Sequence, residues 1–251
     1  MEYLFGDGIA ALRQDEHGVR VQFESGRSRT FDLVVGADGQ HSTVRGLVFG
    51  PEEEFAHHLG MHVAIFRADN FLGLEDWQLW LRDGTAGYGV YPVRDNSELR
   101  ITFGWAAGPS DQGGDHRDVE GRKRVVADRM SAVPWEAPRM LKAMREAPDF
   151  YSDAMAQIRM ERWSHGRVAL LGDAGYCASP LSGQGTSLAL VGAYVLADAL
   201  GRAEGDHRAA YDQYERRMRP FVALNQALAT ENPGGPASEA SVERAKNAIS
   251  L

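Results

Sequence analysis

The segment of residues 172–185 constrains the fold of this chain more than any other part of its sequence. The run before it, residues 167–171, is short and apolar and ends at a glycine, which is typical of a buried parallel strand. The run after it, residues 186–197, is apolar on nearly every side, which predicts a buried helix. The sequence therefore predicts a strand, a glycine turn and a helix, with Asp173 at the carboxyl end of the strand, where open α/β sheets bind their ligands.

The turn and the start of the helix predict a binding site for a polar, partly anionic cofactor. Gly183 and Gly185 allow the backbone to approach a ligand closely. The first turn of a helix has free N–H groups and a partial positive charge, so a group that becomes negative there is stabilised by about 0.3–2 kcal/mol. The alternative is a strand, a turn and a core helix that bind no ligand.

A second apolar strand, residues 31–36, is followed by Asp38. Asp38, Ser42 and Arg45 are four and three residues apart, so they could share one face if a helix starts near His41. An acid, a hydroxyl and a guanidinium at the end of a strand suit the hydroxyls and phosphates of a nucleotide. The alternative is a capped turn with Arg45 in solvent.

Together the two segments resemble the FAD-dependent aromatic hydroxylases, the single-component flavoprotein monooxygenases that include para-hydroxybenzoate hydroxylase and the tetracycline-inactivating enzymes. The resemblance covers nearly the whole chain and rests on two of the family's fingerprints, Asp38-Gly39-x-x-Ser42-x-x-Arg45 and Gly172-Asp173 with Pro180-x-x-Gly183-Gln184-Gly185. It implies a mixed α/β (α+β) fold, in which an incomplete FAD-binding Rossmann-like domain accompanies an antiparallel β-sheet substrate domain and C-terminal helices.

The resemblance also implies the cofactors, FAD and NAD(P)H as its reductant, and a role for each matching residue. Asp173 would bind the ribityl chain of FAD, the backbone from Gly183 to Thr186 would lie by the pyrimidine end of the flavin, and Pro180 would lie near its reactive face. Asp38 would lie near the flavin nucleotide and the passing NAD(P)H. The predicted cofactor-binding residues are Asp38, Gly39, Ser42, Arg45, Gly172, Asp173, Pro180, Gly183, Gln184, Gly185 and Thr186. No residue is assigned as a catalytic acid or base.

The family's first fingerprint, Gly-x-Gly-x-x-Gly, is not found, and Ala11 stands where Gly6-Asp7-Gly8 would need its third glycine. Residues 2–5 read as an ongoing strand. We therefore expect a fragment that lacks the cradle for the FAD diphosphate and binds FAD poorly by itself. The alternatives are a flavin-dependent reductase or halogenase of the same fold, a flavin-free remnant, and a chain that another chain completes; the halogenase motif Trp-x-Trp-x-Ile-Pro is not found.

Hydrophobic patterns predict the organisation of the chain. Residues 1–55 and 160–230 are expected to form the FAD-binding domain, residues 56–159 the substrate domain, and residues 231–251 a tail with a short helix. The predicted elements are several short strands over 2–36, strands from 56 past 101, a glycine-rich loop over 109–118, helices over 118–131, 136–146, 185–200, 211–228 and 238–249, and a strand over 150–162. The helix over 211–228 carries an apolar stripe and should kink at Pro220.

The resemblance implies that the middle sheet forms a wall over the flavin and that substrate binds between the two, with Tyr88, Tyr91, Phe103 and Trp105 as candidate lining residues. Because neighbouring residues of a strand face opposite sides, a slip of one residue would reverse which of them line the pocket. The alternative is that all four pack against the domain's own helices.

Composition limits the partners of the chain. A net charge of −8 argues against nucleic acid and anionic membranes as partners. The resemblance implies a small-molecule, aromatic or polyketide-like substrate instead. Cys177 is the only cysteine, which suits a reducing cytoplasm. His58 and His62 have a spacing that could bind metal on a helix, but their segment favours a strand, so no metal site is predicted. The sequence does not indicate an oligomeric state.

Overall fold

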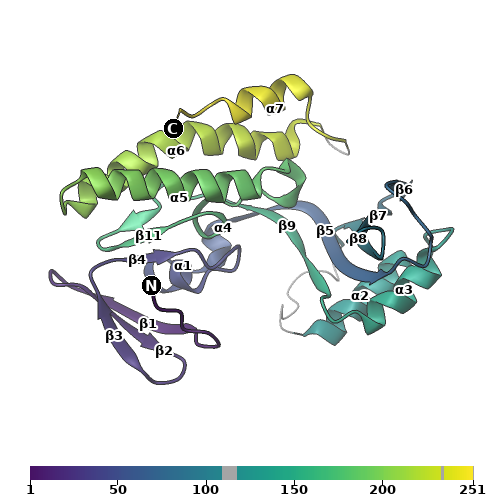
Figure 1. The fold of residues 1–251 in the computed structure, drawn as a ribbon, viewed down its shortest axis with the longest axis horizontal. Coiled ribbons are helices and arrows are strands. Elements are labelled where there is room, and N and C mark those ends of the chain that lie inside the picture. The colour runs from purple at the N-terminus through teal and green to yellow at the C-terminus, as the bar shows by residue number, and fades with distance from the viewer. Residues whose placement is uncertain (109–117, 233–234, 251) are drawn as a thin grey trace. The chain divides into compact units, whose positions relative to one another are not determined.

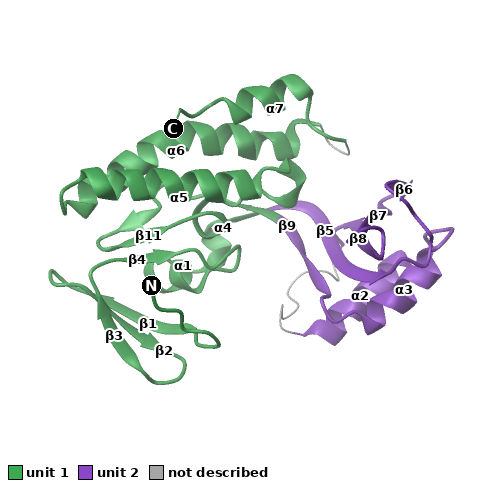
Figure 2. Cartoon of the chain, viewed as in Figure 1, with its two compact units in different colours: residues 1–57, 156–251 green, residues 58–155 purple. Residues whose placement is uncertain are grey.

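The computed structural model describes residues 1–108, 118–232 and 235–250 (Figure 1). Unit 1 comprises residues 1–57 and 156–251, and unit 2 comprises residues 58–155 (Figure 2). Of the predicted glycine-rich loop, all but Asp118 lies outside the described residues. None of the described helices is long and apolar enough to cross a lipid bilayer.

Unit 1 contains two three-stranded sheets. Its strands are β1 (Ile9–Gln14), β2 (Val19–Phe23), β3 (Ser28–Phe31), β4 (Val34–Gly36), β10 (Ser164–His165) and β11 (Val168–Leu170). The first three form an antiparallel sheet, whereas β4 pairs in parallel with β11, which in turn pairs antiparallel with β10. The predicted parallel strand before Gly172 is thus confirmed, and β4 is the edge strand of its sheet.

Helices form the rest of unit 1. They are α1 (Thr43–Val48), α4 (Asp173–Tyr176), α5 (Gly185–Arg202), α6 (His207–Glu231) and α7 (Glu239–Lys246), with 3-10 turns at Glu52–Glu54 and Pro180–Ser182. Figure 1 shows α5 and α6 lying side by side. The predicted stripe of α6 is confirmed as core: Tyr211, Tyr214, Met218, Phe221 and Leu228 are all buried. The helix continues through Pro220.

Two local predictions in unit 1 are wrong, and a third is only partly right. Residues 2–5 form no strand, because their backbone pairs with no other strand in the described part of the chain. The predicted strand over 31–36 is split into β3 and β4 at Asp32 and Leu33, since the two halves pair with different sheets. Finally, α5 is buried on one side only: Leu190 is 68% exposed and Tyr194 is 54% exposed.

Unit 2 is an antiparallel sheet with one face covered by helices, as predicted. Its strands are β5 (Ala56–Asp69), β6 (Leu79–Asp83), β7 (Ala86–Val93), β8 (Glu98–Ala106) and β9 (Tyr151–Ile158), in the order β6-β7-β8-β5-β9. The helices α2 (Val119–Met130) and α3 (Ala137–Glu146) pack on the sheet, with Val126, Met130, Met140 and Met144 in the shared core. The histidines at 57, 58 and 62 lie in β5, which confirms the predicted strand.

Candidate functional site

The two acidic residues of the predicted site follow neighbouring parallel strands. Leu170 of β11 pairs with Gly36 of β4, so the carboxyl ends of both strands lie at the same edge of the sheet. Asp38 follows β4 directly, and Asp173 opens α4 just after β11. Both residues are exposed. The structure thus brings the two sequence motifs together at the edge where open α/β sheets bind their ligands.

Asp38 organises the turn that leads into α1. Its carboxylate accepts hydrogen bonds from the hydroxyl of Ser42 at 2.6 Å and from the backbone N–H of Val44 at 2.9 Å. Ser42 is the N-cap of α1, and its Oγ accepts from the N–H of Arg45 at 2.9 Å. Asp38 therefore lies outside the helix and acts as a second cap, so the three residues share a hydrogen-bond network rather than one helical face.

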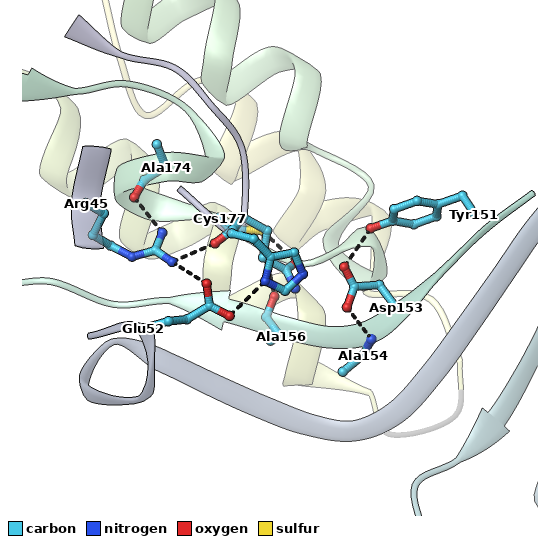
Figure 3. Close-up of polar contacts among 10 residues, drawn as sticks. Arg45, Glu52, Tyr151, Asp153, Ala154, Ala156, Ala174 and Cys177 are labelled. Atoms are coloured by element: carbon cyan, nitrogen blue, oxygen red, sulfur yellow. Dashed lines mark hydrogen bonds and ion pairs between the residues drawn. The ribbon is translucent and has the colours of Figure 1, made fainter. Parts of the chain in front are cut away.

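Arg45 has no exposed side-chain surface. Its Nη1 donates to the carbonyl of Ala174 at 2.9 Å, and its Nη2 donates to the carbonyl of Gln40 at 2.7 Å and to Glu52 at 2.8 Å (Figure 3). Burial lowers the pKa of the guanidinium, and Glu52 acts against that shift. Both Nη groups thus donate hydrogen bonds to other residues of the chain. Arg45 is not exposed to solvent as the sequence alternative had it, and its side chain connects α1 to the start of α4.

The turn before α5 is tight and strained. Ser179 has φ of +72° and ψ of 148°, a region that residues with a side chain rarely adopt. Pro180 then begins a 3-10 turn that ends at Gly183, whose φ of +65° is left-handed. A Cβ at Gly183 would meet no atom within 4 Å, so the turn leaves open space at this glycine.

The N-terminus of α5 lies open beside Asp173. Gln184, its N-cap, makes no side-chain capping bond, and in the described part of the chain the N–H groups of Gly185, Thr186 and Ser187 have no acceptor. A Cβ built at Gly185 would lie 3.9 Å from Oδ1 of Asp173. A helix of 18 residues therefore directs its positive end and free donors at an open space that a carboxylate borders.

Two glutamines that the sequence did not mark, the buried Gln157 and the half-buried Gln226, hold this turn in place. Gln157 is fully buried and donates to the carbonyls of Ala178 and Gln226. Gln226 donates to the carbonyls of Ile158 at 2.9 Å and Cys177 at 3.1 Å. Cys177 itself is buried, with its sulfur 3.7 Å from the carbonyl of Ala156 (Figure 3). Each of these bonds joins segments distant in sequence, so spacing could not reveal them.

Two buried tyrosines, Tyr176 and Tyr214, form hydrogen bonds next to α4. The hydroxyl of Tyr214 lies 2.9 Å from that of Tyr176 and donates to the carbonyl of Leu170 at 3.0 Å. Burial raises the pKa of both tyrosines, that of Tyr214 most strongly. Trp163 packs on both rings. Both hydroxyls therefore stay protonated and contribute no charge of their own next to α4.

The four candidate substrate residues divide between the two faces of the unit 2 sheet. Tyr88, Phe103 and Trp105 are 3%, 0% and 2% exposed and belong to the core beneath α2 and α3. These three therefore follow the alternative of packing against the domain's own helices. Tyr91, which is 37% exposed, lies on the opposite face because it is an odd number of residues from Tyr88. None of the described helices of unit 2 belongs to the core on that face.

Unit 2 also has an open cavity of about 700 Å³ beside α3. It is lined by charged side chains that include Arg67, Glu98, Arg139, Lys142 and Glu146. None of the predicted site residues lines it.

Comparison with known proteins gives a consistent result. Residues 1–228 match a family model described as an FAD binding domain. The chain is 48% identical to the uncharacterized protein MT1298 of Mycobacterium tuberculosis, a match that covers 100% of this chain and 68% of that protein. It is 38% identical to a flavin-dependent monooxygenase from an unknown prokaryotic organism, over 88% of this chain and 57% of that protein.

A solved structure gives the same likeness. The crystal structure of tetracycline destructase Tet(51) has a TM-score of 0.89 and 33% sequence identity, and the match covers 98% of this chain and 69% of that one. The chain thus spans between about half and two thirds of the length of these relatives.

Proposed function

This chain belongs to the FAD-dependent aromatic hydroxylase family of flavoprotein monooxygenases, and on that premise we propose that it is the part of an FAD- and NAD(P)H-dependent monooxygenase that holds the flavin ring and the substrate. One observation carries the proposal. Two parallel strands, β4 and β11, bring Asp38 and Asp173 to one sheet edge, beside the open N-terminus of α5.

The residues at this edge fit the flavin half of FAD. Gly39 and Gly183 have φ of +85° and +65°, and a Cβ at either would meet no atom within 4 Å, so the backbone leaves room for a flat ring system. Asp173 accepts no hydrogen bond within the described residues and can accept one from a hydroxyl. Free N–H groups at α5 can donate to the carbonyl edge of a flavin.

In the proposed mechanism, bound FAD supplies the transfer of electrons from NAD(P)H to oxygen for hydroxylation. Asp173 would accept a hydrogen bond from the ribityl chain of FAD. The N-terminus of α5 would stabilise negative charge on the pyrimidine end of the flavin by about 0.3–2 kcal/mol. Gly183 would let the turn approach the flavin, and Asp38, which caps α1, would hold that helix in place at the nucleotide side.

In this proposal, polypeptide other than these 251 residues holds the diphosphate of FAD, because the chain contains no Gly-x-Gly-x-x-Gly. The surface of unit 1 supports this. Among the residues that the structure describes, the edge strand β4 pairs on one side only, and its Val35 is 40% exposed. Leu47 of α1 and Leu190 of α5 are exposed as well. An unpaired edge flanked by apolar side chains suits the addition of a further strand and helix.

For substrate, we propose a fused-ring, polyketide-like aromatic compound. Support comes from the likeness to tetracycline destructase Tet(51), which exceeds 30% identity over nearly the whole chain. Tetracycline, a molecule of four linearly fused six-membered rings, is therefore the first compound to test.

Flavin binding by the chain as it stands tests the proposed site. Because the site's residues address the ring and the ribityl chain, we expect weak binding, with FMN and FAD of similar affinity in equilibrium dialysis. Asp173→Ala should weaken FMN binding by about 10- to 100-fold, the loss of a hydrogen bond to a charged group. Asp212→Ala is the matched control, since Asp212 is an exposed acid on α6.

Equal FMN affinities for the Asp173 variant and the wild-type chain would contradict the assignment of Asp173. Tight stoichiometric FAD binding by the chain would contradict the proposed separate cradle. Tetracycline-stimulated oxidation of NADPH by the flavin-loaded chain tests the monooxygenase reaction, and stimulation by no ring compound would contradict it.

A further inference from the structure

Unit 2 contains a cavity that shares no residue with the candidate flavin site, namely the one of about 700 Å³ beside α3. We call it the α3 cavity. On its strand side lie Arg67 and Asp69 near the end of β5 and Glu98 at the start of β8. On its helix side lie Lys142 and Glu146 of α3. The volume is in the range of small-molecule sites, which is about 300–1,000 Å³.

Small side chains keep the α3 cavity open. Ala68, Ala143 and Ala147 belong to its lining, so longer side chains at these positions would fill it. Phe71 and Arg139 belong to the lining as well and hold each other in place. The guanidinium of Arg139 lies 4.6 Å from the centre of the Phe71 ring and donates to the carbonyl of Phe71 at 3.2 Å.

Two acids face each other on the strand side of the cavity. Asp69 and Glu98 are register partners on β5 and β8, and like charges directly opposite each other destabilise an antiparallel pair. The neighbouring partners, Arg67 and Arg100, are also alike in charge, but Asp149 contacts both. Its carboxylate lies 3.7 Å from Nε of Arg67 and accepts from Nη1 of Arg100 at 2.8 Å.

Neither acid of this pair is fully balanced by the described part of the chain. The side chain of Asp69 makes no hydrogen bond or ion pair with any described residue. Glu98 has ion pairs with Arg67 at 3.6 Å and Arg94 at 3.3 Å, both through Oε1. Its Oε2 is buried and accepts no hydrogen bond from the described residues. Positive charge at this end of the sheet would therefore be stabilised.

The helix side of the cavity carries one charge of each sign. Lys142 and Glu146 are four residues apart and so share one face of α3, yet neither side chain has a hydrogen bond or ion pair among the described residues. On the strand side, the guanidinium of Arg67 donates no hydrogen bond to a described residue, because its ion pairs are too long. The cavity thus offers cationic donors and, separately, two acids without a partner.

We propose that the α3 cavity binds a basic amino acid, a small molecule with one carboxylate and two cationic groups. Its carboxylate binds between Lys142 and Arg67, its α-ammonium binds at Asp69 beside Glu98, and its side-chain cation binds at Glu146. At a rise of 1.5 Å per residue, Lys142 and Glu146 are about 6 Å apart along α3, close to the length of an extended lysine side chain.

An organic cation fits this cavity better than a metal ion. Among the described residues, no group of three or more His, Cys, Asp or Glu side chains could hold a metal ion. The proposed site is independent of the function proposed above, because neither flavin nor NAD(P)H takes part in it.

Isothermal titration calorimetry of the full chain, without flavin, tests the site with three probes. L-lysine has all three charged groups, L-norleucine lacks the side-chain ammonium, and cadaverine lacks the carboxylate. We expect norleucine and cadaverine each to bind about 3- to 10-fold more weakly than lysine, between the effect of an exposed ion pair and that of a charged hydrogen bond.

Single substitutions should separate the three contacts. Lys142→Met should weaken binding of lysine and norleucine by about 3- to 10-fold and leave cadaverine unaffected. Glu146→Gln should weaken binding of lysine and cadaverine and leave norleucine unaffected. Asp69→Asn should weaken binding of all three probes. The matched control is Asp128→Asn, since Asp128 is an exposed acid of α2 that does not line the cavity.

Ala143→Leu tests the cavity itself, because it fills part of the volume and changes no charge. It should abolish the binding of lysine, while thermal unfolding shows that the variant stays folded. Three outcomes would overturn the proposal: binding of none of the probes, equal affinities for lysine, norleucine and cadaverine, or a loss in Asp128→Asn as large as that in Asp69→Asn.

Discussion

Arg45 gives the sharpest test of how the nucleotide side of the site is built. Its resemblance to a family fingerprint suggested a residue that faces a nucleotide, whereas its guanidinium contacts only groups of the chain itself. Replacement of Arg45 by methionine keeps most of the buried aliphatic part of the side chain and removes the N–H donors of the guanidinium. The free energy of unfolding of the flavin-free protein then separates a clamp from a ligand-binding residue.

The magnitude follows from what the substitution leaves behind. The carbonyls of Ala174 and Gln40 each lose a charged donor, at about 1–3 kcal/mol for a buried acceptor left unpaired. Glu52 is a third exposed and keeps His41 at 2.8 Å, so its loss is below about 1 kcal/mol. We expect a total of about 3–5 kcal/mol, in line with broken buried ion pairs. For a protein of this size that lowers Tm by roughly 6–20 °C.

Thermal and urea unfolding, followed by circular dichroism without flavin, measure the loss. The control is Arg202→Met, which removes an arginine 2.8 Å from Asp198 that is 73% exposed, and it should cost less than about 1 kcal/mol. Arg45→Lys should recover less than half of the lost free energy of unfolding. A lysine ammonium cannot donate in the two directions in which the Nη1 and Nη2 groups of Arg45 donate. If Arg45→Met and Arg202→Met unfold alike, the clamp does not exist.

Three further predictions concern stability. Asp38→Ala removes both bonds that cap α1, and should cost about 1–2 kcal/mol in urea unfolding, whereas a cost near zero would exclude the capping role. Burial raises the pKa of Tyr211 to about 12, so the stability it contributes is complete below pH 10, its value in the unfolded chain, and is lost as pH rises toward 12. Tyr211→Phe should therefore flatten the fall in Tm over that range, and an unchanged profile would refute it. Burial would raise the pKa of Asp149, but the N–H of Arg67 and the guanidinium of Arg100 outweigh it and lower that pKa. The resulting stability is present above pH 3.8 and lost as pH falls through the lower folded value, so Asp149→Asn should remove part of the acid sensitivity of unit 2, by about 1 kcal/mol.

Local signals in the sequence were sufficient to predict where the two strands β4 and β11 end. The apolar runs 167–171 and 31–36 lead to Gly172 and Gly36, and an acid follows each glycine within two residues. Both motifs follow strands of one sheet. Backbone hydrogen bonding and burial act over such short segments, so they leave a readable pattern. The boundaries were less certain, since whether Asp32 and Leu33 continue a strand depends on which sheet lies beside them.

Contacts between distant residues could not be predicted in the same way. The spacing of Asp38, Ser42 and Arg45 suggested one helical face, but α1 begins only at Thr43, and the guanidinium binds a carbonyl 129 residues further along the chain. The same is true of Gln226, which holds the turn after α4 from 49 residues away. A polar side chain that tertiary structure brings to a distant carbonyl carries no periodic signal of its own.

The two faces of the unit 2 sheet show where more could have been read. Alternation alone separates Tyr88 from Tyr91 but does not say which of them is inside. The glycines could have decided it. A face covered by helices must fill the space beneath them with side chains, whereas Gly87, Gly89 and Gly104 supply none. The residues that alternate with the core residues, which include these glycines and Tyr91, must therefore lie on the face without helices. Tyr88, Phe103 and Trp105 must then face the core. Where the glycines of neighbouring strands all lie on one face of a sheet, that face is the one to search for a bound ligand.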